Sequence, residues 1–315
     1  MIVLLSGMAL VAAAQTQPAA PAILQQAALY QIIALGERHG VPAMEEFIEA
    51  LVSDDEFGEQ FDVLILENAS AAHQNLIDRY VSGDDIPEDA LAPVWRDAVN
   101  SLLAGGDNTH YARLLAAVRE NNRDDVSPVR VIACDPAIDW ANMDSASAFW
   151  AAMSSRKAFC VDQIRSRALD TGDTALLLRG RSHLTHTRGN GDEAALGYQL
   201  DQSHPGASYI IHLLTDTAPA LQALTRPSMD PMTVETAGED SADRRSQFGG
   251  DATYQETIDA FLLLGPADEM NATVSAGFTD PEYWTELERR AQLIYNASYR
   301  ELAEQFGNPL PPTTD

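Results

Sequence analysis

The sequence predicts an α/β domain with a mainly parallel sheet flanked by helices and a site at the carboxyl edge of the strands. Short apolar runs alternate along the chain with longer segments whose apolar residues recur at helical spacing. The short runs are apolar throughout, which is typical of strands buried on both faces of a parallel sheet. The predicted strands are residues 30–35, 63–66, 129–134, 175–178, 209–214 and 258–264.

Helices are predicted between and after these strands. Pro42 suits the first turn of a helix, because the first turn leaves N–H groups unbonded and proline has none. In that helix Met44, Phe47 and Ile48 begin an apolar stripe. The remaining predicted helices lie within residues 73–81, 91–102, 111–118, 145–170 and 281–304.

The domain organisation is predicted from length and composition. A chain of 315 residues, 45% of them hydrophobic, can bury one large core, so residues 29–306 are predicted as a single α/β domain. Residues 15–28, rich in Pro and Ala, are predicted as a flexible linker, and 307–315 as a disordered tail. The polar stretch 226–253 is predicted as a mobile loop, since long loops in compact domains cover a site or move.

The first 14 residues, MIVLLSGMALVAAA, are apolar and end in three alanines. This pattern predicts a signal peptide cleaved near Ala14, and therefore a periplasmic or secreted protein. The segment is too short to span a bilayer, so no stable membrane insertion is expected. Cys134 and Cys160 are the two cysteines, and the sequence leaves open whether they pair or stay as buried thiols.

The chain is strongly acidic. It has 47 Asp and Glu against 20 Lys and Arg, a formal net charge of −27. Such a surface repels phosphate backbones and anionic lipids, which argues against nucleic acid and membrane surfaces as partners. A solubility or salt adaptation of the host explains the acidity better than an acidic binding device does. The expected partner is therefore a small-molecule substrate or ligand.

Ionisable side chains follow four of the predicted strands. Because the carboxyl ends of parallel strands meet at one edge of a sheet, where α/β folds bind ligands, these side chains are expected to converge. In the order of the strands, they are Glu37 and His39, then Glu67, then Asp135, then Arg181 with His183.

Local context separates these residues from the other histidines. Glu67 follows four apolar residues, so without a functional role its carboxylate would be buried and unpaired. Asp135 stands before a proline and is equally well explained as a helix cap. Gly36 and Gly40, which bracket Glu37 and His39, are expected to let the backbone turn sharply, and Gly180 precedes Arg181 as Gly36 precedes Glu37. The histidines without such context, predicted as structural or solvent-facing, are His73, His110, His186, His204 and His212.

Several common catalytic motifs are absent from the sequence. It has no G-x-S-x-G elbow, no phosphate loop ending in Gly-Lys-Ser/Thr, no H-E-x-x-H and no G-x-G-x-x-G after a strand. A serine-hydrolase triad is therefore disfavoured, although Ser182 stands beside His183. Hydrolysis by an activated water fits better, with His39 or a bound metal as the activator.

Three short segments together resemble the erythromycin esterase-like and ChaN-like superfamily, which is related to the TraB/TIKI group. They are residues 35–40 (LGERHG), the strand end at Glu67, and residues 180–183 (GRSH). The resemblance implies a parallel α/β core with an early G-E-x-(x)-H segment and a late G-x-x-H segment. In the esterase branch it implies that the early histidine, here His39, is the base for water attack on a lactone.

The branches of this superfamily imply different activities. The esterases have two residues between the early Glu and His, where this chain has only Arg38. The ChaN-like branch has the shorter spacing and implies haem binding. The TraB/TIKI-like group implies proteolysis with a divalent metal.

The leading hypothesis is an exported hydrolase acting on an ester, lactone or amide. Its catalytic residues would be Glu37, His39, Glu67 and His183. A divalent metal held by Glu37, His39 and His183 stays open, and the alternative function is binding of haem or another small ligand without turnover. The residues expected to bind substrate are Arg38, Asp135 and Arg181.

Overall fold

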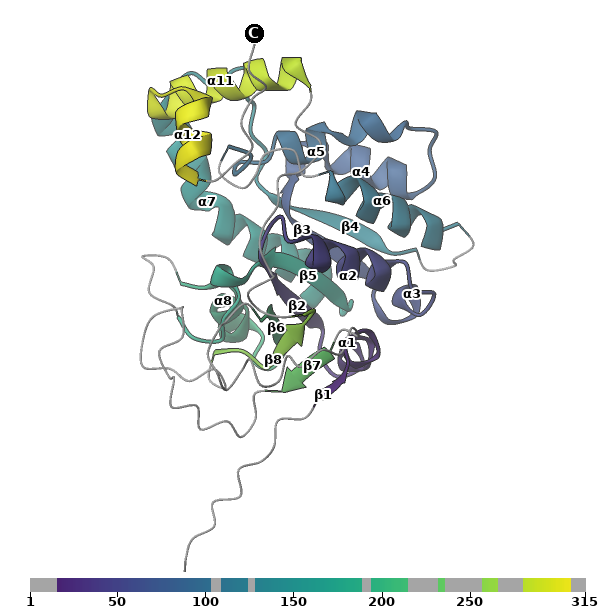
Figure 1. Cartoon of the computed structure of the whole chain (residues 1–315). Coiled ribbons are helices and arrows are strands. Elements are labelled where there is room, and N and C mark those ends of the chain that lie inside the picture. Colours follow the sequence, from purple (N-terminus) through teal and green to yellow (C-terminus); the bar gives the residue numbers. More distant parts are fainter. Residues whose placement is uncertain are drawn as a thin grey trace, which may run out of the picture.

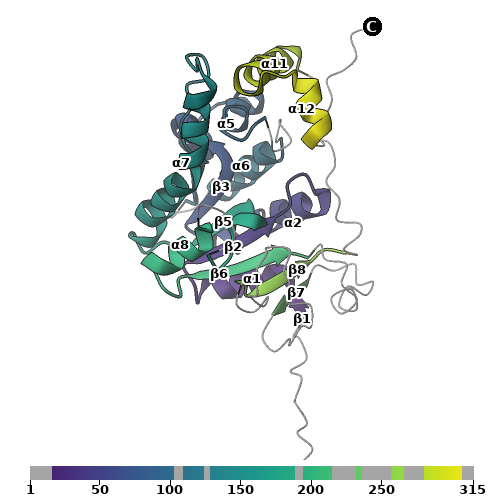
Figure 2. The same ribbon diagram turned by 90° about the vertical axis from the view of Figure 1, so that its left-hand side faces the viewer.

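The computed structural model describes residues 16–102, 109–123, 128–188, 194–214, 232–235, 257–265 and 280–306. These residues form one twisted sheet with helices on both faces (Figures 1 and 2). The strands are β1 (Thr16–Pro18), β2 (Ile32–Glu37), β3 (Val63–Ser70), β4 (Arg130–Asp135), β5 (Ala175–Gly180), β6 (Ser208–Leu213), β7 (Met232–Glu235) and β8 (Ala260–Leu263).

The strand order is β1-β7-β8-β6-β2-β5-β3-β4. Strands β8, β6, β2, β5, β3 and β4 run parallel, whereas β7 pairs antiparallel with both β8 and β1. The predicted fold class, an α/β domain with a mainly parallel sheet, is confirmed. The order also makes β2, β5 and β3 immediate neighbours, so their carboxyl ends lie side by side.

The helices divide between the two faces of the sheet. One face is covered by α1 (Ala19–Ala27), α2 (Pro42–Val52), α4 (Gln74–Val81) and α6 (His110–Asn121), and the other by α7 (Ala146–Ile164) and α8 (Leu196–Ser203). The remaining helices are α3 (Phe57–Gln60), α5 (Pro93–Arg96), α11 (Pro281–Tyr295) and α12 (Tyr299–Phe306), with short helical turns η1 (Ala71–His73), η2 (Glu88–Leu91), η3 (Arg165–Leu169) and η4 (Arg181–His183).

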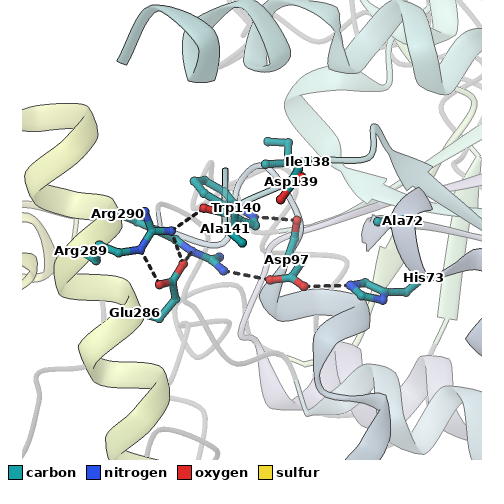
Figure 3. A pocket seen from close by; sticks show the side chains of 10 residues that line it. All are labelled: Ala72, His73, Asp97, Ile138, Asp139, Trp140, Ala141, Glu286, Arg289 and Arg290. Atoms are coloured by element: carbon teal, nitrogen blue, oxygen red, sulfur yellow. Dashed lines mark hydrogen bonds and ion pairs between the residues drawn. The ribbon is translucent and has the colours of Figure 1, made fainter. Parts of the chain in front are cut away.

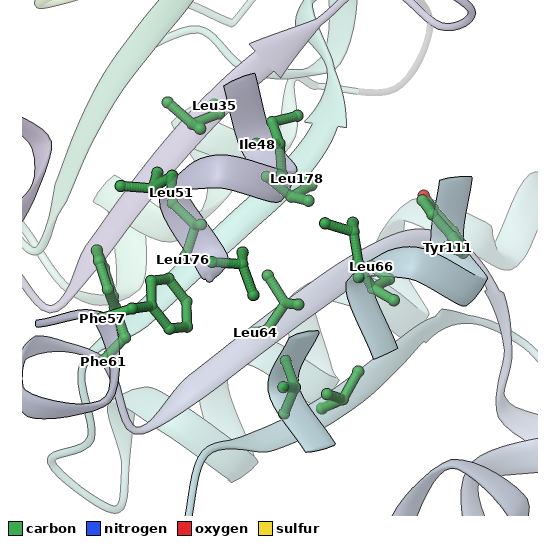
Figure 4. Close-up of a cluster of buried hydrophobic side chains, with 14 of the residues drawn as sticks. Leu35, Ile48, Leu51, Phe57, Phe61, Leu64, Leu66, Tyr111, Leu176 and Leu178 are labelled. Atoms are coloured by element: carbon green, nitrogen blue, oxygen red, sulfur yellow. The ribbon is translucent and has the colours of Figure 1, made fainter. Parts of the chain in front are cut away.

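Alternation along the strands builds a core on each face. Leu35 and Leu66 pack under α2 and α6 (Figure 4), while Ala34 and Ile65 pack on the opposite face with Cys160 of α7. This two-sided burial explains why the strands are apolar throughout. A smaller third cluster joins α11 and α12 to the amino-terminal half of α7, and these helices lie together in Figure 1.

The predicted flexible linker is wrong over residues 16–27. Strand β1 pairs with β7, and helix α1 buries Ile23 and Leu24 against the sheet. The stretch is ordered because its apolar residues recur at helical spacing and find a sheet face to cover. Residues 1–14 and 307–315, the predicted signal peptide and tail, lie outside the described residues.

Three other segments differ from the prediction. The helix predicted over 91–102 is limited to η2 and α5, and the one over 281–304 is divided because Asn296 adopts a left-handed conformation with φ 52°. Ser298 and Glu301 then form reciprocal bonds that start α12 as a capping box. Strand β7 lies within the predicted mobile loop 226–253, whose other residues lie outside the described part.

Candidate functional site

The site lies where β2, β5 and β3 end. Glu37 is the last residue of β2 and pairs in register with Gly180, the last residue of β5, while Glu67 follows the point where β3 pairs with β5. The neighbouring strand ends therefore bring together carboxylates that are 30 residues apart in the chain. The expected convergence is seen for Glu37, His39, Glu67 and His183.

His39 lies between the two glutamates. Its Nδ1 is 3.1 Å from Glu37 Oε1 and its Nε2 is 3.3 Å from Glu67 Oε2. Burial alone would lower the pKa of His39, but the charge of Glu37 and the contacts with both carboxylates outweigh it and raise the pKa to about 10. These surroundings therefore favour the imidazolium form of His39 at neutral pH.

Glu67 is the buried centre of the site, with 1% of its surface exposed. Its Oε2 accepts a 2.6 Å bond from the Gly180 N–H, and its Oε1 lies 3.7 Å from both Arg156 Nη2 and Arg179 Nη2. Burial would raise the pKa of Glu67, but the charges of Arg179, His39 and Arg156 hold it well below its usual range. Glu67 is therefore a fixed anion.

His183, unlike His39, is uncharged at neutral pH. Its Nε2 lies 3.9 Å from Glu67 Oε1. Burial, assisted by the charges of Arg179, Lys157 and Arg156, lowers the pKa of His183 to about 4 despite the nearby Glu67. The site therefore combines a protonated and a neutral histidine around one carboxylate.

The two strand-end glycines are needed for space and not for a sharp turn. A Cβ at Gly180 would lie 3.3 Å from His39 Nε2, 3.4 Å from Glu67 Oε2 and 3.7 Å from His183 Cδ2. A Cβ at Gly36 would overlap the ring of His212. Neither glycine has a positive φ, whereas Gly40 does, at 75°, so the turn that the sequence predicted is made there.

The three predicted substrate-binding residues differ in their placement. Arg38 is exposed and Arg181 is partly exposed beside the strand ends. Asp135 does not face the site: its side chain is fully buried, and its oxygens accept bonds from Arg156 Nε at 2.5 Å and from the Val99 N–H at 2.8 Å. Burial raises the pKa of Asp135, although Arg156 opposes this. Its expected role as a substrate contact is therefore wrong.

Two arginines that line the buried side of the site were missed. Arg156, on α7, bonds to Asp135 and to Asn68 Oδ1 at 3.1 Å, and Arg179, on β5, is 1% exposed. A signal for Arg179 was present, since it follows three leucines of a buried strand and a buried cation needs a counter-charge. Arg156 had no comparable signal, because helix position alone does not show which face meets the site.

The cysteines, whose state the sequence left open, form a disulfide in the structure. Cys134 precedes Asp135, the last residue of β4, and Cys160 lies one turn after Arg156 on α7. The bond therefore joins the two elements that supply the buried Asp135–Arg156 pair.

Glu37, His39 and Glu67 also form a candidate metal donor set. One ligand atom from each lies within 4.8 Å of the others. Two carboxylate oxygens and one imidazole nitrogen suit a divalent transition metal. Within the described part of the chain this set includes Glu67 in place of the predicted third ligand, His183.

A separate cavity of about 630 Å³ lies between η1, residues 138–141 and α11 (Figure 3). His73 Nε2 is 2.8 Å from Asp97 Oδ2, and Asp97 Oδ1 accepts a 2.9 Å bond from Arg290 Nη2. Arg290 also covers the ring of Trp140 at 4.0 Å. These groups meet one another's hydrogen-bonding needs, and the network attaches α11 to the carboxyl edge of the sheet.

Comparison with known proteins identifies the fold. No family model and no curated protein sequence matches the chain. The structure is similar to that of a mutant erythromycin esterase in its open conformation, with a TM-score of 0.52 and 12% identity over 78% of this chain and 93% of the other. The predicted resemblance to erythromycin esterase-like proteins is thus confirmed for the fold.

Two further solved structures show weaker similarity. A Bacillus cereus protein has a TM-score of 0.48 and 12% identity over 76% of this chain and 90% of its own. A haem-bound ChaN of Campylobacter jejuni has a TM-score of 0.42 and 11% identity over 77% and 91%. Among the described residues, no helix is both long and apolar enough to cross a membrane.

Proposed function

We propose that the protein is a hydrolase of the erythromycin esterase-like kind that cleaves an ester, lactone or amide with an activated water. The observation that carries this proposal is the contact of two histidines, His39 at 3.3 Å and His183 at 3.9 Å, with the buried carboxylate of Glu67; their surroundings raise the pKa of the first and lower that of the second. Neighbouring groups whose pKa values are pushed apart are the arrangement that acid–base catalysis requires. Their side chains keep 28% and 37% of their surface exposed, so a substrate can reach both.

The charge states assign the roles. His183, neutral above about pH 4, accepts a proton from the attacking water. The His39 imidazolium, whose two ring nitrogens face Glu37 and Glu67, offsets the charge of these carboxylates, so that they repel the developing oxyanion less. The His183 imidazolium then returns its proton to the leaving group, which restores the neutral base. Glu37 and Glu67 hold His39 in its charged form throughout.

A substrate screen with matched histidine variants tests this assignment. Ester, lactone and amide substrates are offered to the full chain, and the best is used to compare His183→Asn with His73→Asn. His73 pairs with Asp97 outside the site and serves as the control. We expect His183→Asn to lower kcat by about a hundredfold or more while the control retains activity. Full activity of His183→Asn contradicts the assigned base.

A metal-dependent variant of this function is supported by the donor set of Glu37, His39 and Glu67. A divalent ion held there would supply Lewis-acid activation of water or of the carbonyl group. Binding would release the proton of His39, because an imidazole nitrogen must be unprotonated to ligate. Metal analysis of protein purified without a chelator or an affinity tag tests this variant; an absence of bound metal together with full activity contradicts it.

Export and haem binding remain separate proposals. The apolar residues 1–14 support cleavage near Ala14 and a periplasmic or secreted location. Sequencing the amino terminus of protein from the cell envelope tests it, since an intact Met1 contradicts cleavage. Binding of haem without turnover is tested by adding hemin and measuring the Soret band, which stays unshifted if the hydrolase proposal stands alone.

A further inference from the structure

A second histidine held between two carboxylates lies shortly after the proposed base, His183, in the chain. Both ring nitrogens of His186 contact a carboxylate: Nδ1 is 2.6 Å from Asp201 Oδ2, and Nε2 is 2.8 Å from Asp259 Oδ2. An ionised carboxylate only accepts hydrogen bonds, so both nitrogens donate and the ring is an imidazolium. Burial would lower the pKa of His186, but the bonds to the two carboxylates outweigh it and raise the pKa to about 9.

The two carboxylates that His186 bridges are both tied to strand β6. Asp201 lies on α8, and its Oδ1 accepts a 2.9 Å bond from Ser208 Oγ. Asp259 directly precedes β8, and its Oδ2 accepts a 2.7 Å bond from the Ile210 N–H. Ser208 and Ile210 belong to β6, which pairs with β2. His186 is therefore attached, through two side chains, to the neighbour of the strand on which the site begins.

The chain between the base and His186 is attached to the same part of the fold. The Leu184 N–H donates to the Arg181 carbonyl at 3.1 Å, which closes the turn η4. The Leu184 carbonyl accepts a 2.6 Å bond from His212 Nε2, on β6. The His186 N–H donates to the Thr257 carbonyl at 2.8 Å. Main-chain bonds and the bridging imidazolium thus fix the same short segment.

His183 depends on this segment for its position. Its contact with Glu67 is 3.9 Å, which is too long for a hydrogen bond, and 37% of its side chain is exposed. The backbone that precedes His183 is held by β5, and the backbone that follows it leads directly to His186. The direction in which the ring points is therefore set by the main chain on its two sides.

We propose that His186, by bridging Asp201 and Asp259, is a positioning residue that fixes the turn on which the base lies. This inference rests on the proposed function, in which His183 accepts a proton from water. Catalytic side chains must be held close to their productive geometry by the contacts around them, and a misplacement of about 1 Å can lower a rate about a hundredfold. Two charge-assisted bonds to one ring are an attachment of this kind.

Steady-state kinetics of His186→Gln test the role on the best substrate found by screening. The glutamine amide can take the place of Nε2 but leaves no donor at the position of Nδ1, so the bridge to Asp201 is lost. We expect kcat to fall at least about tenfold while KM changes less than about twofold, because a misplaced base impairs the chemical step and not substrate binding. A KM that rises while kcat is unchanged overturns the proposal.

His204→Gln is the matched control. The side chain of His204 is about as exposed as that of His186, 26% against 22%, and its Nε2 lies 3.5 Å from one carboxylate oxygen, Asp170 Oδ1. His204 directly follows α8, whereas Asp170 directly follows η3. The control therefore loses one weak histidine–carboxylate pair and should keep the kcat of the wild type.

Hydrogen exchange measured by mass spectrometry reports on the turn directly and needs no substrate. The Leu184 and His186 N–H groups are bonded to carbonyls, so their exchange requires local opening. In His186→Gln we expect residues 181–186 to exchange at least about tenfold faster, while β3 and β4 exchange as in the wild type. Equally faster exchange in all three segments would show general destabilisation and would overturn the positioning role.

Asp201→Asn is the second variant, in case His186→Gln does not fold. It keeps the shape of the side chain and weakens one of the two bonds to His186, so the same local change of smaller size is expected. Locally faster exchange, with no substrate cleaved by the wild type, contradicts the hydrolase function and supports the attachment. Unchanged kcat in the folded variants overturns the positioning role and leaves the hydrolase function standing.

Discussion

At the scale of single residues, His39 and His183 show how different surroundings change the pKa of two identical side chains. Two carboxylates contact the His39 ring, whereas His183 is near one carboxylate and several cations. Their pKa values consequently move in opposite directions, to about 10 and about 4. The pattern G-E-x-H places Glu37 beside His39, but the second glutamate, Glu67, lies on another strand.

The first prediction concerns pH. The base His183 is active when neutral, above its pKa of about 4, and His39 offsets the charge of Glu37 and Glu67 when protonated, below its pKa of about 10. We expect kcat/KM to follow a bell with limbs near these values and a broad maximum around neutral pH. A rate that rises only as the pH approaches 10 would instead identify His39 as the base.

The second prediction treats His39 and Glu67 as a unit. His39→Ala should abolish most activity and also lower the unfolding free energy at neutral pH, because it removes the cation that the buried Glu37 and Glu67 share. Glu67→Gln should also abolish activity and cost about 3 kcal/mol of unfolding free energy, since it leaves buried cations unpaired. The double variant should lose much less activity than the sum of the two single losses, as expected for residues that act together.

Turnover and urea denaturation of all three variants measure these effects. His73→Ala is the control and should keep its activity, because His73 pairs with Asp97 away from the site. If folded His39→Ala retains full activity, then His39 is a structural residue.

The third prediction concerns Gly180. The alanine Cβ in Gly180→Ala would lie 3.3 Å from His39 Nε2 and 3.4 Å from Glu67 Oε2, closer than most side-chain contacts. The backbone there, φ −52° and ψ 127°, is allowed for alanine, so we expect a folded protein with at least about tenfold lower kcat. Circular dichroism and steady-state kinetics test this. Wild-type turnover would show that the space above Gly180 is not used.

At the scale of elements, the Cys134–Cys160 disulfide joins β4 to α7 next to the Asp135–Arg156 pair. Helix α7 brings Arg156 to Glu67 only while it stays seated on the sheet. The disulfide therefore helps to hold Arg156 in place beside the site, in addition to stabilising the fold.

The fourth prediction follows from this position. Replacing both cysteines with serine opens a loop of 26 residues and should cost about 3 kcal/mol of unfolding free energy. Activity should fall as well, because Arg156 loses part of its support. Guanidinium denaturation and turnover measure both effects in the serine variant and in reduced wild-type protein. The reductant should not affect the serine variant; equal stability of all forms would contradict the prediction.

At the scale of the whole molecule, the net charge of −27 sets the long-range electrostatics. Like charges on a compact surface repel one another, and the unfolded chain relieves this repulsion by spreading them. Salt screens the repulsion, since the Debye length falls from about 30 Å at 0.01 M to about 8 Å at 0.15 M.

The fifth prediction is that the melting temperature at pH 7 rises over this range of NaCl concentration. The rise should disappear near the isoelectric point, where the net charge vanishes, and this comparison is the control for other effects of the salt. Calorimetry at both pH values measures it. A melting temperature that falls with salt at pH 7 would show that attractive ion pairs dominate instead.

Much of the fold and part of the site could be predicted from the sequence alone. Apolar runs and helical spacing are local patterns, so they identified the parallel strands, and strand ends identified Glu37, His39, Glu67 and His183. Residues 19–27 also have apolar residues at helical spacing, but their Pro and Ala content favoured a linker, and only the sheet face that they cover shows that the helix is packed.

Only the tertiary structure decided the charge states and the supporting residues. The strand order makes β5 the neighbour of both β2 and β3, and this places two glutamates on His39 and two arginines behind Glu67. Strand order is not encoded locally, since it depends on which faces and edges pack best once the chain has collapsed. The sequence by itself thus determined which side chains reach the carboxyl edge, and the tertiary contacts determined their protonation, because pKa depends on distances between groups far apart in the chain.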